Sequence, residues 1–97
     1  MPTYIAILSK DPDTDYGVHF PDFPGCVTAG STLEEVKAMA AEVLPFHIEG
    51  MLEDGEAIPA PSSLEQVLAD PDNRVGLPIL VQVPDEVLRR ADRPAAE

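Results

Sequence analysis

The sequence predicts an α+β domain in which an antiparallel sheet carries one long helix across a face, with a short helix near the C-terminal end. Short apolar runs separated by turn-forming residues fill residues 4–30, as is typical of strands. A longer segment then repeats apolar residues at three- and four-residue spacing, which indicates an amphipathic helix. Packing that helix against the sheet is the compact way to bury its apolar stripe.

Three strands are expected before the helix, at Tyr4–Leu8, Tyr16–Phe20 and Cys26–Gly30. Each is short and rich in apolar, β-branched or aromatic residues. Turn formers in residues 10–15 predict a hairpin loop, and two prolines with a glycine in residues 21–25 predict an irregular connection. The three strands would form an antiparallel meander. Because strand side chains alternate, one face of it should hold Tyr16, Val18 and Phe20.

The long helix should begin at one of two capping boxes, Ser31 with Glu34 or Thr32 with Glu35. Pro45 lies in its middle and predicts a kink, because proline removes a backbone hydrogen bond. The expected apolar stripe comprises Leu33, Val36, Ala40, Val43, Leu44, His47, Ile48, Met51 and Leu52.

The polar side of the helix is acidic as far as its expected end near Glu53, where Asp54-Gly55 allows a left-handed residue. Such a row is either a simply solvated face or a negative surface that docks on cations. Among the extended features of the sequence, this acidic row is the one with an evident use in binding. The row consists of Glu34, Glu35, Glu42, Glu49 and Glu53.

A short helix and a fourth strand are expected after the long helix. Prolines should keep residues 57–61 extended. A capping box from Ser62 to Glu65 would open the short helix, which should end near Ala69. Leu77–Val83 is the expected fourth strand, and its proline at position 78 favours the strand start or a sheet edge.

The end of the chain predicts a last helix from Pro84 through Arg93 and a frayed tail. The predicted order is therefore β-β-β-α-α-β-α. We expect one domain over residues 1–84, followed by a short C-terminal helix and tail over residues 85–97.

The charge is strongly acidic, with 18 acidic against 6 basic residues and a net charge of -12. Fourteen of the acids lie in residues 1–72, where the only bases are Lys10 and Lys37. Such a chain repels phosphates, so binding to nucleic acid is disfavoured, whereas a basic protein partner suits it. A lone cysteine, with no signal peptide and no membrane-length apolar run, predicts a cytoplasmic protein.

The aspartates of the first loop do not make a convincing metal site. Asp11, Asp13, Asp15 and Asp22 have EF-hand spacing, but Tyr16 stands where that loop requires glycine. The first strand carries no carboxylate, which argues against a two-metal nuclease of the ribonuclease H type.

Candidate catalytic side chains are also few. We expect His19 on the outer side of the sheet, His47 packed on the helix stripe and Cys26 in the core. The serines at helix starts are accounted for as caps. The sequence therefore predicts no enzymatic activity, no metal and no cofactor.

Several runs of residues 3–84 together resemble the HicB antitoxin family. They are Tyr4–Leu8, Asp15–Gly30 with its FPDFPGC run, Thr32–Glu35, Glu49–Glu56, Ile58–Ser62 and Leu64–Leu68. The resemblance implies a partial ribonuclease H-like β-β-β-α-β fold. It also implies direct binding and neutralisation of a small basic HicA-type toxin, which has a double-stranded-RNA-binding-like fold and cuts messenger RNA using a histidine. The negative surface then has a basic RNA groove as its target, and we expect Glu42, Glu49 and Glu53 to contact the toxin.

The resemblance has two departures. Pro45 interrupts the long helix, which bears on any toxin-docking surface there. The second departure lies at the C-terminal end. Family members usually append a ribbon-helix-helix or helix-turn-helix module, whereas Val81–Asp92 resembles only the strand and first helix of a ribbon-helix-helix. We therefore expect no complete DNA-binding module and no operator binding by this chain. A homodimer is expected, because a sheet edge needs cover that a second copy can supply. The alternatives are an orphan HicB-fold regulatory or scaffold protein without a toxin partner, and a residual nuclease.

Overall fold

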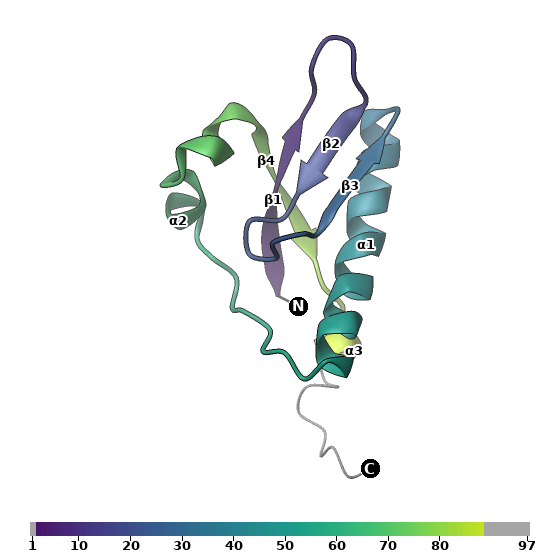
Figure 1. Cartoon of the computed structure of the whole chain (residues 1–97), viewed down its shortest axis with the longest axis vertical. Helices are drawn as coiled ribbons and strands as arrows, with labels where there is room; N and C mark the ends of the chain where they lie inside the picture. Colours follow the sequence, from purple (N-terminus) through teal and green to yellow (C-terminus); the bar gives the residue numbers. More distant parts are fainter. Residues whose placement is uncertain (1, 89–97) are drawn as a thin grey trace.

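The computed structural model describes residues 2–88 and confirms the α+β class (Figure 1). The four strands form a single antiparallel sheet in the order β3-β2-β1-β4. The predicted order of elements is confirmed, with one 3-10 helix added between the second helix and the last strand. The elements are β1 (Thr3–Ser9), β2 (Tyr16–His19), β3 (Val27–Gly30), α1 (Leu33–Glu53), α2 (Leu64–Leu68), η1 (Pro71–Val75), β4 (Leu77–Gln82) and α3 (Asp85–Leu88).

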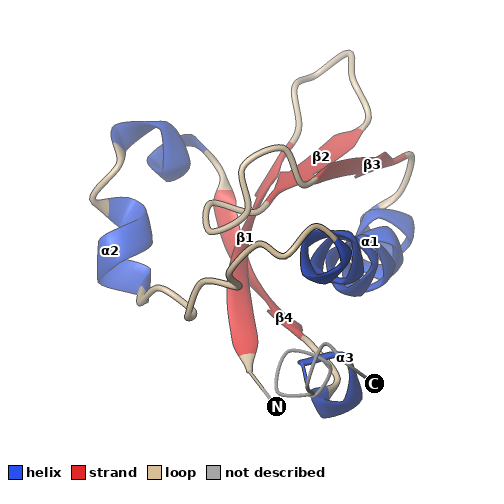
Figure 2. Cartoon of the chain, turned by 60° about the horizontal axis from the view of Figure 1, so that its bottom comes forward, coloured by secondary structure: helices blue, strands red, loops and turns tan. Residues whose placement is uncertain are grey.

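Strand β1 lies inside the sheet and is buried on both of its faces, which explains its unbroken apolar sequence. Tyr4, Ala6 and Leu8 belong to the main core, which the strands share with α1. Ile5 and Ile7 point the other way and pack with Val67 of α2. Figure 2 shows the two helices on opposite sides of the sheet.

Helix α1 begins at the second of the two predicted caps. The Thr32 hydroxyl accepts a hydrogen bond from the Glu35 backbone N–H at 3.0 Å. The Glu35 carboxylate accepts one from the Ser31 backbone N–H at 3.1 Å. The helix runs through Pro45 as one continuous element and ends at Glu53, as predicted, with Asp54 as its C-cap. Its fully buried stripe consists of Val36, Ala40, Leu44 and Ile48.

Four local predictions differ from the structure. The short helix is capped by Ser63 with Gln66, and not by Ser62 with Glu65, because Ser62 bonds elsewhere. Helix η1 was not predicted, although Asp70 caps it by accepting a hydrogen bond from the Asp72 backbone N–H. Leu33, expected on the apolar stripe, is 44% exposed at the end of the helix. Strands β2, β3 and β4 are each one residue shorter than expected.

The last predicted segment is described only in part. Helix α3 covers Asp85–Leu88, within the predicted helix from Pro84 through Arg93, whose residues 89–93 are not described. Residues 89–97 lie outside the described residues, and with them the predicted tail. Strand β4 ends the sheet beside β1, so Pro78 is on an edge strand as predicted.

Two glycines make a matched test of the packing of α1 against β3. A Cβ at Gly30 would lie 2.7 Å from the Val36 backbone nitrogen, whereas a Cβ at Gly50 would meet nothing within 4 Å. Gly30→Ala should therefore lower the free energy of unfolding by about 1–3 kcal/mol, because α1 must shift away from β3. Gly50→Ala should raise it by about 1 kcal/mol, because alanine favours the helix. Urea denaturation measures both, and a fully stable Gly30→Ala protein would contradict the packing.

Candidate functional site

A tight loop between β2 and β3 forms one wall of the candidate site. The Phe23 backbone N–H donates to the Phe20 carbonyl at 2.9 Å, and the Cys26 N–H donates to the Phe23 carbonyl at 2.9 Å. Gly25 adopts a φ of 88°, in the left-handed region that favours glycine. This turn buries the Phe23 and Cys26 side chains and leaves Pro24 exposed.

The loop is held to the segment that follows α1. The Asp22 carboxylate accepts hydrogen bonds from the Ser62 backbone N–H at 2.9 Å and from the Ser62 hydroxyl at 2.5 Å. The Tyr4 hydroxyl donates to the Pro59 carbonyl at 2.6 Å. We call this set of three hydrogen bonds the Asp22 clasp. From the sequence alone, Asp22 was considered as a calcium ligand. In the structure its carboxylate instead accepts the hydrogen bonds that hold the loop to the Ser62 segment.

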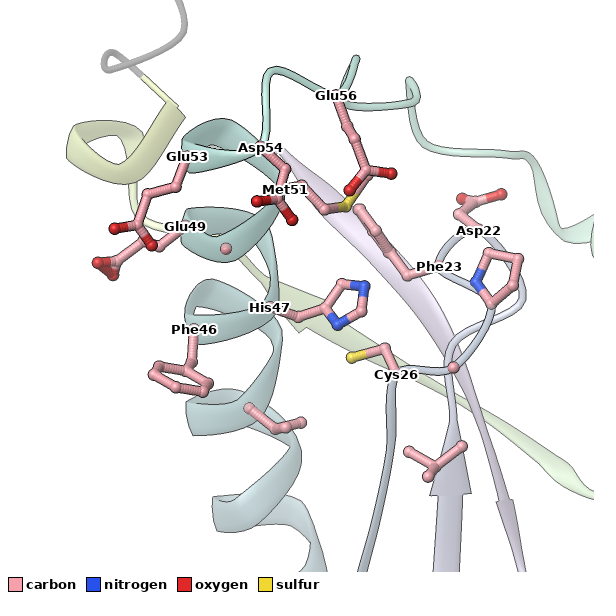
Figure 3. A pocket seen from close by; sticks show the side chains of 15 residues that line it. Asp22, Phe23, Cys26, Phe46, His47, Glu49, Met51, Glu53, Asp54 and Glu56 are labelled. Carbon is pink, nitrogen blue, oxygen red and sulfur yellow. The ribbon is translucent and has the colours of Figure 1, made fainter.

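An open pocket of about 860 Å³ separates the loop from the second half of α1 (Figure 3). Phe23 packs edge-on against Tyr4, with ring centroids 4.8 Å apart, and against His47 at 5.9 Å. His47 is half-buried, and its packing on the helix stripe agrees with the prediction. Met51 and Val43 add apolar surface to the pocket.

The pocket contains no activated nucleophile. Burial raises the pKa of the Cys26 thiol, so the thiol stays protonated and is a poor nucleophile. His19 is far from the pocket, since its Nε2 lies 3.0 Å from Asn73 Oδ1 on the α2 side of the sheet. Within residues 2–88, no three His, Cys, Asp or Glu side chains gather as a metal-binding group. The described part of the chain likewise has no helix long and apolar enough to cross a membrane.

The predicted glutamates do not all lie on one surface. Glu35 serves the helix cap, so it does not belong to a free acidic face. Glu49 and Glu53 line the pocket, together with Asp54 and Glu56. Glu42 lies beside a second hollow of about 340 Å³, which adjoins the first because both include Val43 and Phe46. The structure therefore brings Glu42, Glu49 and Glu53 to one continuous surface, as a binding function would require.

Exposed apolar side chains on this surface were missed by the sequence reasoning. Phe46 is 77% exposed, Val27 is 61% exposed and Met39 is 41% exposed. The only signal was that Met39 and Phe46 interrupt the polar side of the helix. Apolar side chains rimmed by charge are typical of protein interfaces. We name this surface the α1–β3 face; it comprises Val27, Thr28, Met39, Glu42, Val43, Phe46, Glu49 and Glu53.

Comparison with known proteins identifies relatives of this chain. Residues 4–95 match a family described as the HicB-like antitoxin of bacterial toxin–antitoxin systems. Antitoxin HicB 1 of Photorhabdus laumondii is 37% identical over 67 residues, which are 69% of this chain and 43% of that protein. The chain spans about half the length of the curated relatives it matches.

Solved structures agree with the sequence match. The antitoxin HicB of Burkholderia pseudomallei has a TM-score of 0.75 at 27% identity, covering 95% of this chain and 83% of that one. A chain of the HicA3 and HicB3 toxin–antitoxin complex has a TM-score of 0.70 at 26% identity, covering 84% and 98%.

Alkaline pH should destabilise the protein through the Asp22 clasp. Burial, and then the negative charge of Asp22, raise the pKa of Tyr4 above its ordinary 10.0. The protonated hydroxyl is therefore favoured by folding. This stabilisation is complete below pH 10 and is lost as pH rises through the raised pKa.

Tyr4→Phe keeps the aromatic ring but removes the donor to Pro59. At neutral pH it should lower the free energy of unfolding by about 1 kcal/mol. It should also reduce the loss of unfolding free energy at alkaline pH. Urea denaturation at a series of pH values measures that loss. As a control, Cys26→Ala is introduced into both the wild type and the Tyr4→Phe protein. It removes the other group whose pKa is raised. An equally steep alkaline loss in the Tyr4→Phe protein would contradict this account.

Proposed function

The chain belongs to the HicB-like antitoxin family, and we propose that it neutralises a small basic HicA-type toxin by direct contact through its α1–β3 face. The observation that carries this proposal is the position of Phe46. It is 77% exposed on a face that also presents Glu42, Glu49 and Glu53. An exposed aromatic anchor with a charged rim suits a protein partner of opposite charge.

Charge supports a basic partner. The chain has a net charge of -12, so a basic protein is attracted to it at long range and a nucleic acid is repelled. Long-range attraction raises the association rate, whereas buried contacts set how long the complex lasts. Burying Phe46 would contribute on the order of 2 kcal/mol through apolar area alone.

The relatives support the same class of partner. One structural neighbour comes from a complex of HicA3 with HicB3, and another from a toxin–antitoxin complex of Streptococcus pneumoniae. The second neighbour is 28% identical, with a TM-score of 0.71 over 90% of this chain. The proposal assigns the toxin-binding domain to residues 1–84.

In the proposed mechanism the chain supplies no catalytic group. A HicA-type toxin needs a basic groove for the phosphates of its RNA substrate. Carboxylates on the α1–β3 face would occupy that groove, and Phe46 would pack against apolar surface beside it. RNA would then be excluded by competition for the same cations. This is why we assign the chain an inhibitory and not an enzymatic function.

Charge reversal tests the assigned surface. Replacing Glu42, Glu49 and Glu53 together by lysine should weaken binding to a small basic HicA-type toxin by several kcal/mol, because attraction becomes repulsion. Titration calorimetry measures the affinity.

In the wild type, the association rate should also fall as salt rises, since charges are screened over about 8 Å at 0.15 M.

The matched control reverses the same number of charges elsewhere. Asp11, Asp13 and Asp15 are exposed at the β1–β2 hairpin, away from the α1–β3 face. Their triple lysine variant has the same net charge as the first, so it should lose only the long-range part of the attraction. Equal weakening by the two variants would contradict the α1–β3 face. A HicA-type toxin that fails to bind the wild type would contradict the toxin partnership itself.

A further inference from the structure

Strand β3 has an open edge whose hydrogen-bonding groups can be identified. It ends the sheet beyond β2, with which it pairs in antiparallel register. The Phe20 backbone N–H donates to the Cys26 carbonyl at 3.2 Å, so these two residues form a hydrogen-bonded pair. Bonded and non-bonded pairs alternate along an antiparallel ladder, and residue 28 therefore bonds to β2. The backbone groups of residues 27 and 29 point away from the sheet.

The two outward-facing residues are accessible. Val27 is 61% exposed, and Ala29 is also exposed. Within residues 2–88, no further strand pairs with this edge of the sheet. Val27 and Ala29 together present two backbone N–H donors and two carbonyl acceptors. Such an edge is a template on which an extended segment of another protein can pair.

Charge indicates which kind of segment fits the β3 edge. Helix α1 lies alongside β3 (Figure 1). Val27 lines the same pocket as Glu49 and Glu53, and Thr28 lines the same hollow as Glu42. A second copy of this acidic chain would bring like charges together at the edge. Cationic side chains of a basic segment would instead meet carboxylates of opposite charge.

The opposite edge of the sheet lacks these carboxylates. At β4 the Val83 backbone N–H donates to the Pro2 carbonyl at 2.9 Å, so alternation leaves the backbone groups of residues 80 and 82 pointing outward. Strand β4 contains no acidic residue, and the groove beside it is lined by the cation of Lys37. Both edges therefore present backbone groups, but a basic segment gains more attraction at β3 than at β4.

We propose that an extended basic segment of the HicA-type toxin adds a fifth strand to the sheet along β3. This inference rests on the proposed function and specifies how the partner is recognised. The N–H groups of Val27 and Ala29 donate to carbonyls of the added strand, and their own carbonyls accept from its N–H groups. Because side chains alternate along a strand, every second one lies on the α1 side of the sheet.

The hollow beside β3 fits one of these side chains. It has a volume of about 340 Å³ and is lined by Thr28, Met39, Val43 and Phe46, with Glu42 as its one carboxylate. Lysine and arginine have an apolar stem and a charged head, so they match an apolar hollow that has a single acid. Backbone pairing supplies affinity that depends little on sequence, whereas pockets for alternate side chains supply specificity.

Amide hydrogen exchange tests the added strand without altering the chain. The isotope-labelled chain is measured free and bound to a HicA-type toxin. The amides of Val27 and Ala29 should exchange rapidly in the free chain, and binding should slow them by at least about tenfold, because they gain partners. The amides of Leu80 and Gln82 are the control, since they face outward at the β4 edge and should not change. Protection at the β4 edge in place of β3, or at neither edge, would overturn the inference.

Proline substitution tests the same edge through affinity. Ala29→Pro removes one outward N–H and should weaken toxin binding by about tenfold or more in titration calorimetry. Leu80→Pro makes the same change at the β4 edge and should bind as the wild type does. Neither N–H bonds within the sheet, so urea denaturation should show both variants folded.

The outcomes separate this inference from the proposed function. A wild type and an Ala29→Pro variant that bind the toxin equally would overturn the added strand and leave the toxin partnership intact. A toxin that fails to bind the wild type would overturn the partnership, and the added strand with it. The exchange measurement uses the unaltered chain, so it decides the question even where a proline variant is unfolded.

Discussion

The Asp22 clasp is the constraint on which the rest of the structure depends. One carboxylate accepts two hydrogen bonds from Ser62, a residue 40 positions later, and Tyr4 fixes the same segment through Pro59. The clasp lets the chain pass from α1, on one face of the sheet, to α2 on the other (Figure 2). It also holds the β2–β3 loop in the turn that buries Phe23 as the wall of the pocket. The FPDFPGC and IPAPS runs, on which the resemblance in the sequence rests, are therefore hydrogen-bonded to each other in the structure.

Helix α1 meets two different requirements on its two sides. Its inner stripe is completely buried and supports the fold, because α1 covers the sheet faces of β2 and β3. Its outer side presents Phe46 among carboxylates. This exposed ring is not part of the core and leaves apolar surface in contact with water. Because the buried stripe fixes the rotation of α1 about its own axis, the residues on its outer side hold fixed positions relative to the sheet. The proposed recognition surface is thus carried by the same helix that builds the core.

Much of the fold could be predicted because its signals are local. The apolar run of β1, a helix cap at Ser31 or Thr32 and the end of α1 before Gly55 follow from periodicity and turn chemistry. Ser62 was misassigned as a cap, because its true partner Asp22 is distant in sequence and the pattern could not show it. For the candidate site, Glu42, Glu49 and Glu53 were named from charge, and their contact with a toxin stays a prediction. Phe46 was missed, because periodicity shows which residues leave the stripe but not how exposed they are.

The central claim is that a basic toxin docks on the α1–β3 face with Phe46 as its anchor. Photocrosslinking from a benzoylphenylalanine at position 46 tests it most directly, with the same group at Leu64 as control. Both positions are exposed, but Leu64 is on α2, on the other side of the sheet. The account predicts that position 46 captures a small basic HicA-type toxin and that position 64 does not. Capture from position 64 alone, or equally from both, would contradict it.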